Sequence, residues 1–97
     1  MSTTDTEQDD PTRFELPADC TAEAAGALRE ALLALLARGE TVTVGARSVT
    51  RLDAAVAQLL VAFVFSAGDA GVFVNFTSPS PAFARSVRRL GLDPVLS

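Results

Sequence analysis

A run of fifteen residues without a charged side chain, residues 54–68, most constrains what this chain can fold into. Twelve of the fifteen are apolar, and only Gln58, Ser66 and Gly68 are not. A helix of this composition has no charged stripe to face water, so it must be covered on more than one side. The run is shorter than the roughly 20 apolar residues that cross a bilayer, so we expect no membrane insertion.

Two explanations remain for how the apolar surface of this helix is covered. A chain of 97 residues seldom wraps a central helix completely. Part of the face that carries Ala54, Ala57, Val61 and Phe65 is therefore expected to meet another protein. A purely internal role is the alternative, and homodimerisation through the helix is also open.

Three short segments carry the pattern of β-strands, namely residues 12–16, 41–44 and 72–76. The first alternates polar and apolar side chains and stops at Pro17, which predicts an edge or near-edge strand. The second is β-branched throughout, which favours a central position. Residues 92–96 are expected to pack back as a short extended segment, although Pro94 disfavours a central strand there.

Three longer segments carry the pattern of helices, namely residues 22–38, 54–70 and 81–90. The residues at their predicted N-caps are Thr21, Asp53 and Ser80, and the glycines after their predicted ends are Gly39, Gly71 and Gly91. Strands that alternate with such helices imply parallel strands joined by right-handed crossovers. The predicted fold class is therefore α/β, with a mostly parallel or mixed sheet of three to four strands covered by about three α-helices, over residues 12–97.

Composition argues against most catalytic classes. The chain contains no His, Lys, Tyr or Trp. Without His there is no Ser-His-Asp triad and no imidazole metal ligand, and without Lys there is no P-loop lysine and no Schiff base. The single Cys20 cannot form an internal disulfide and is predicted to be inert. We expect no enzymatic activity, no cofactor and no metal site.

The net charge of −4 comes entirely from the first ten residues. These ten residues contain four acids, Asp5, Glu7, Asp9 and Asp10, and no basic residue. In the rest of the chain, eight acids are balanced by eight arginines. A nearly neutral body has no broad basic footprint for nucleic acid. Residues 1–11 are predicted to be a disordered acidic leader, and the lack of a signal-peptide pattern favours the cytoplasm.

Three stretches form an ordered set: LPADCTAEAAGALREALLALLARG, VTVGARSVTRLDAAVAQLLVAF and GVFVNFTSPSPAFARSVRRLGL. They contain an R-L-D turn followed by Gln58 and paired leucines, a turn at residues 77–81 similar to N-P-S-P, and a closing L-G-L. This set resembles the STAS domain, the fold of bacterial anti-sigma-factor antagonists. The resemblance implies a small sheet covered by helices and a role in binding partner proteins, commonly switched by phosphorylation.

The usual phosphorylation switch is expected to be absent. Members of the family commonly carry Ser or Thr directly after the aspartate of the turn, and this chain has Ala54 after Asp53. They also commonly carry an acid at the end of the preceding strand and a glycine at the helix start, where this chain has Gly45 and Val56. Alanine has no hydroxyl, so a kinase-type partner cannot add the charge of roughly −2 that would reorganise the interface.

The predicted partner surface combines a loop at residues 47–52 with the start of the following helix. Its members are Arg47, Ser48, Thr50, Arg51, Leu52, Asp53, Ala54, Ala55 and Ala57. Ser48 and Thr50 are either turn hydroxyls or displaced phosphoacceptors. Asp53 is either a helix cap alone or also a contact residue, and the two arginines are either solvated or paired with partner carboxylates.

Two further groups of residues have simple interpretations. Arg85, Arg88 and Arg89 share one face of the last helix and are predicted to be solvated rather than to bind an anion or nucleic acid. The six Phe residues are predicted to lie in the core.

Two functions are compatible with these patterns. The first is a non-catalytic interaction module resembling an anti-sigma-factor antagonist or signalling adaptor, whose partner is a kinase-like anti-sigma factor or a related regulator. The second resembles the small STAS subunit of a lipid-transporting ABC system, which docks on the ATPase. The discriminating observation is which of these proteins binds.

Overall fold

A three-stranded parallel sheet forms the centre of the fold in a computed structural model that describes residues 12–96. Its strands are β1 (Arg13–Glu15), β3 (Val42–Gly45) and β5 (Val74–Thr77), in the order β1-β3-β5. The predicted α/β class is confirmed, as are the edge position of β1 and the central position of β3. The acidic leader predicted over residues 1–11 lies outside the described residues.

A second parallel pair of strands was not predicted from the sequence. It joins β2 (Asp19–Cys20) to β4 (Arg51–Leu52). The interpretation of residues 47–52 as a loop throughout is therefore wrong at its end. Strands of two residues are too short to show a period-two pattern, so only the pairing of distant segments reveals them.

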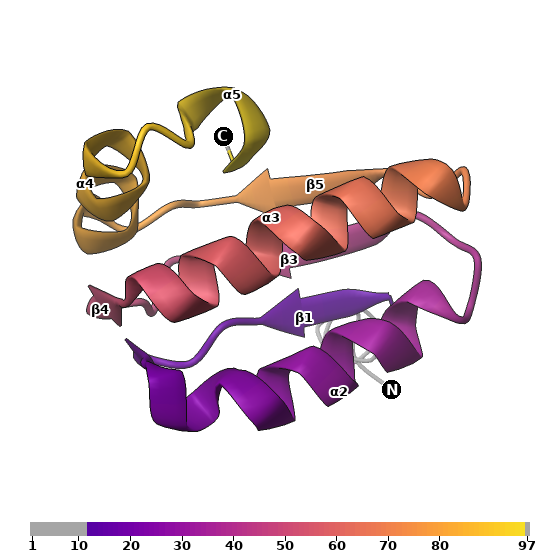
Figure 1. The fold of residues 1–97 in the computed structure, drawn as a ribbon, viewed down its shortest axis with the longest axis horizontal. Helices are drawn as coiled ribbons and strands as arrows, with labels where there is room; N and C mark the ends of the chain where they lie inside the picture. The colour runs from indigo at the N-terminus through magenta and orange to yellow at the C-terminus, as the bar shows by residue number, and fades with distance from the viewer. Residues whose placement is uncertain (1–11, 97) are drawn as a thin grey trace, which may run out of the picture.

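The helices cover one side of the sheet and its far edge. They are η1 (Ala22–Ala24, a 3₁₀ turn), α2 (Ala25–Leu36), α3 (Ala54–Asp69), α4 (Pro81–Arg89) and α5 (Asp93–Leu96). Helices α2 and α3 lie side by side in front of the sheet, and α4 and α5 lie beyond β5 (Figure 1). Gly39, Gly71 and Gly91 follow α2, α3 and α4 with φ angles of 73°, 76° and 73°, the left-handed conformation predicted for helix stops.

Several predicted boundaries are wrong. Residues 22–24 form the 3₁₀ turn η1 rather than the start of the α-helix, and the third strand is Val74–Thr77 rather than residues 72–76. The first long helix ends at Leu36 rather than at Arg38, because the N–H groups of Arg38 and Gly39 donate to carbonyls three residues back, in the tighter 3₁₀ pattern. Residues 92–96 are not extended, since the Leu96 N–H donates to the Leu92 carbonyl at 2.9 Å and closes the turn of α5. Pro94 is tolerated there because the second residue of a helix has no intrahelical N–H bond to lose.

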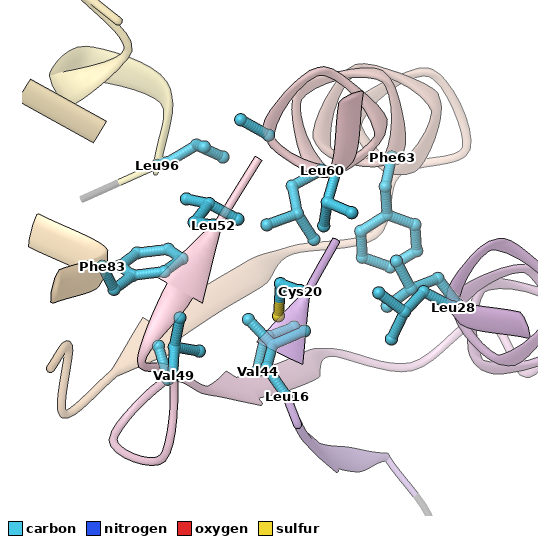
Figure 2. Close-up of a cluster of buried hydrophobic side chains, with 14 of the residues drawn as sticks. Leu16, Cys20, Leu28, Val44, Val49, Leu52, Leu60, Phe63, Phe83 and Leu96 are labelled. Atoms are coloured by element: carbon cyan, nitrogen blue, oxygen red, sulfur yellow. The ribbon is translucent and has the colours of Figure 1, made fainter. Parts of the chain in front are cut away.

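One face of α3 supplies much of the core. Val56, Leu60, Phe63 and Ala67 recur at helical spacing and are buried. The Phe63 ring points toward Leu28 of α2 (Figure 2). This packing confirms that α3 is covered on its inner side by its own fold.

The prediction that all six Phe residues lie in the core is wrong for two of them. Phe63 and Phe83 are buried, but Phe65 and Phe73 are 61% and 77% exposed. Phe65 follows Phe63 by two helical positions, or about 200°, which turns it to the opposite face of α3. Phe73 precedes Val74 in an extended segment, so its side chain alternates away from the helix-covered side.

The start of α4 is attached to the turn after β3 by one side chain. Ser80 is buried, and its Oγ accepts from the Phe83 N–H at 3.0 Å and donates to the Val49 carbonyl at 2.6 Å. Ser80 is therefore the predicted N-cap of α4, with Pro81 as the first helical residue. Phe83 points from α4 toward Val49 and Leu52, which closes this corner (Figure 2).

We predict that Ser80→Ala lowers the free energy of unfolding by about 1–2 kcal/mol, because it removes a cap and leaves the Val49 carbonyl without its donor. Urea unfolding followed by circular dichroism measures the change. Ser66→Ala, at an exposed position of α3, is the control and should shift stability by no more than about 0.5 kcal/mol. Equal effects of the two substitutions would contradict this role of Ser80.

Candidate functional site

The segment between β3 and α3 is fixed by buried anchors that alternate with exposed side chains. Ala46 and Val49 are buried, and the Ala46 N–H donates to the Thr77 carbonyl at 3.0 Å. On the other side, the Thr50 and Arg51 N–H groups both donate to the Ala18 carbonyl, at 2.8 Å and 3.1 Å. The segment is therefore held at both ends and presents its polar side chains outward.

The structure divides the nine predicted site residues into two groups. Those with exposed side chains are Arg47, Ser48, Thr50, Arg51, Ala54 and Ala55, and Asp53 is half-buried. Ala57 is buried and therefore does not belong to an exposed surface, which corrects its assignment. Leu52 is 8% exposed and reaches the surface only in the lining of a hollow beside Asp53. Leu52 points inward from β4, and Ala57 lies on the inner face of α3 beside Val56. We call the seven accessible residues the docking edge; it lies at the same end of the molecule as α4 (Figure 1).

Asp53 occupies the N-cap position of α3, but its side chain makes no capping bond to that helix. Its Oδ2 instead accepts from the Ala22 N–H at 3.2 Å, at the start of η1. Its own N–H donates to the Cys20 carbonyl at 2.9 Å. Asp53 thus joins the starts of two helical segments, and the predicted capping of η1 by Thr21 does not occur.

The two loop hydroxyls differ in their surroundings. Thr50 Oγ1 donates to the Ala18 carbonyl at 3.1 Å, which is the bond of a turn hydroxyl. Ser48 is exposed, and its hydroxyl has no hydrogen-bond partner among the described residues. Of the two hydroxyls that could serve as displaced phosphoacceptors, the Thr50 hydroxyl is already hydrogen-bonded. The Ser48 hydroxyl has no hydrogen-bond partner among the described residues.

An acid stands beside the end of β3 although β3 itself ends in glycine. A Cβ built on Gly45 would overlap the carboxylate of Glu15, which comes from the neighbouring strand β1. Arg13 Nε donates to Glu15 Oε2 at 2.8 Å, and both side chains are partly exposed. Sequence reasoning missed this arrangement because it depends on the register between two strands.

Two hollows flank Asp53. The larger, which we call the acidic cleft, has a volume of about 660 Å³ and is lined by Asp19, Thr21, Ala22, Glu23, Ala24, Arg51 and Asp53. The smaller, which we call the socket, has a volume of about 350 Å³ and is lined by Leu52, Asp53, Ala54, Ser86, Arg89 and Leu90. The docking edge therefore continues onto η1 on one side and onto α4 on the other, and no periodic pattern could have joined these segments.

The described residues include one thiol, that of the buried Cys20. Burial, with a smaller contribution from the charge of Asp19, raises the pKa of the Cys20 thiol from 9.0 to about 11, so it is not a thiolate at neutral pH. Among residues 12–96, no group of three or more His, Cys, Asp or Glu side chains could hold a metal ion. Within the same residues, no helix is both long and apolar enough to cross a membrane.

We predict that Cys20 gives this protein a fall in stability above pH 9. The unfolded thiol loses its proton near pH 9.0 and the folded thiol near pH 11, so the folded state is progressively disfavoured between the two values. The chain has no Lys and no Tyr, so no other side chain titrates in this window. Urea unfolding from below pH 9.0 to about pH 11 should show this fall in the native protein and a flatter profile in Cys20→Ala. Parallel profiles would contradict the assignment.

We predict that Asp53→Ala lowers the free energy of unfolding by about 1 kcal/mol, because the Ala22 N–H loses its acceptor. Hydrogen exchange of the Ala22 amide should become faster, as measured by NMR. Asp69→Ala, at the other end of α3, removes the same charge without this bond and should leave the Ala22 amide unchanged. A faster Ala22 amide in both variants would attribute the effect to charge rather than to the bond.

Comparison with known proteins agrees with this geometry. The family model described as "Mlab, STAS domain" matches residues 3–97. No curated protein and no solved structure matched the chain. STAS domains are in general non-catalytic modules of protein interaction or signalling, which is consistent with a parallel sheet whose connecting turn presents an anchored, exposed edge. The match covers nearly the whole chain, and the chain belongs to the STAS domain family.

Proposed function

We propose that this STAS domain is a constitutive, non-catalytic binding module that acts as an anti-sigma-factor antagonist or a related signalling adaptor. Its partner is a kinase-like anti-sigma factor or a similar regulator. The observation that carries the proposal is the docking edge, where the buried residues Ala46, Val49 and Leu52 hold the intervening polar side chains outward. Such rigid presentation lowers the entropic cost of binding.

The missing hydroxyl at Ala54 determines how binding is regulated. Ala54 is exposed at the first position of α3 and lines the socket. A phosphate cannot be attached to this side chain, so binding is not released by the family's usual route. We infer that the amount of the partner, rather than a phosphorylation cycle at this position, sets how much complex forms.

A second candidate function is the small STAS subunit of a lipid-transporting ABC system, docked on its ATPase. The observation that favours it is the description of the matching family, which names Mlab. The same docking edge serves both candidates, because each requires a rigid, non-catalytic surface. The identity of the protein that binds separates them.

We predict that Ala54→Glu weakens partner binding by about tenfold or more, because it places a charge at the centre of the docking edge. The fold should survive, since an acid in the first turn of a helix is favourable. Isothermal titration with a purified kinase-like anti-sigma factor, and separately with a purified ABC ATPase, measures the loss and identifies the partner class. Ala62→Glu is the matched control, because Ala62 is exposed on the same helix but lies outside the docking edge. Equal effects of the two variants would place the interface elsewhere.

A further inference from the structure

We propose that the socket receives one aliphatic side chain of the partner together with an adjacent carboxylate. The socket is the hollow between the start of α3 and the last turn of α4. This inference rests on the proposed function, because it names the chemistry of the segment that the partner presents. Three properties of the socket support it: its apolar wall, an unused hydroxyl and an unpaired cation.

The apolar wall accounts for the aliphatic side chain. Leu52 forms part of the wall from the core side, while Ala54 and Leu90 contribute from α3 and from the end of α4. Leu90 is 41% exposed, although a large aliphatic side chain gains from leaving water. The socket has a volume of about 350 Å³, which leaves room for one aliphatic side chain.

The unused hydroxyl belongs to Ser86. This residue is only 8% exposed and lines the socket from α4. Its Oγ has no hydrogen-bond partner among residues 12–96, whereas the other buried serine, Ser80, makes two bonds. The fully buried side-chain oxygen without a partner in the described chain is Thr77 Oγ1, not Ser86 Oγ, so the Ser86 hydroxyl is accessible from the socket and free to bond a group of the partner.

The unpaired cation is Arg89, and it makes a carboxylate the preferred external acceptor. Helix α4 carries Arg85, Arg88 and Arg89 and no acid. Within the described part of the chain the only ion pair joins Arg13 to Glu15, so Arg89 has no acidic partner. The one acid that lines the socket is Asp53, and its Oδ2 is already bonded to the Ala22 N–H. The positive charges of Arg88 and Arg89 also interact favourably with the negative C-terminal end of the α4 dipole. That interaction does not pair Arg89 with an acid, so its guanidinium remains available.

The arginines of α4, all predicted to be solvated, therefore differ in their surroundings. Arg89 lines the socket, whereas Arg85 is exposed on the same helix and does not line it. The outer face of α3 at Phe65 is also apolar, but α3 carries no basic side chain, and the charge nearest to Phe65 along the helix is that of Asp69, one turn further on. The socket is therefore the surface where shape, hydroxyl and charge converge.

A blocked dipeptide tests the socket without any partner protein. N-acetyl-leucyl-glutamate amide is titrated into the ¹⁵N-labelled full chain and followed by NMR. We expect saturable shifts of the amides of Leu52, Ala54, Arg89 and Leu90. Absence of shifts, or shifts confined to the Phe65 face, would overturn the proposal.

Two altered probes separate the apolar from the charged contribution. Replacing leucine by alanine in the dipeptide should weaken binding about tenfold, because the apolar wall loses its contact. Replacing glutamate by glutamine should weaken binding about two- to fivefold, the usual effect of one exposed ion pair. Equal affinity of all three dipeptides would overturn the proposal.

Paired variants assign these effects to named side chains. Arg89→Gln should abolish the preference for glutamate over glutamine, and Arg85→Gln should preserve it, because Arg85 does not line the socket. Ser86→Ala should weaken binding of the glutamate dipeptide more than binding of the glutamine dipeptide. Loss of the preference in Arg85→Gln alone would contradict the assignment. The dipeptide titration contains no partner protein, so a negative result in it does not change the outcome of the Ala54→Glu test. A negative Ala54→Glu result likewise does not change the outcome of the dipeptide titration.

Discussion

The packing of one face of α3 against the sheet is the interaction on which the rest of the structure depends. Leu60 and Val56 are fully buried over the sheet, and Phe63 extends the contact to α2. Each such side chain contributes about 1.5–3 kcal/mol on burial. Because α3 is thereby fixed, its first turn stands rigidly at the carboxyl end of β3, where the connecting segment must emerge.

The position at which the connecting segment leaves β3 determines where the site lies. The segment after β3 is pinned to β5 at Ala46, to the chain before β2 at Thr50, and to α4 through Val49 and Ser80. Its exposed side chains therefore have little freedom to move, and rigid presentation is what a binding surface needs. Asp53 adds a tie to η1, so the acidic cleft and the socket are held in a constant relation to each other.

The outward side of α3 shows how far a small domain can hide an apolar helix. The inner residues are buried, but Phe65 remains 61% exposed because it points away from the sheet. The absence of charge along residues 54–68 indicated that more than one side would be covered. The fold covers the inner side and the flank against α2, and leaves the outermost stripe to solvent or to a partner.

The sequence by itself determined the order of the main strands and helices, the α/β class, the central place of β3, and the absence of a hydroxyl at residue 54. These depend on local periodicity, on β-branching and on residue identity, all of which are properties of neighbouring residues. Only the tertiary structure decided the β2–β4 pair, the bond from Ala22 to Asp53, the burial of Leu52 and Ala57, and the meeting of Ser86 and Arg89 with Ala54. The strand pair, the bond and the meeting of Ser86 and Arg89 with Ala54 each join residues about 30 positions apart. These contacts and the burial arise from packing and register, which no local pattern encodes.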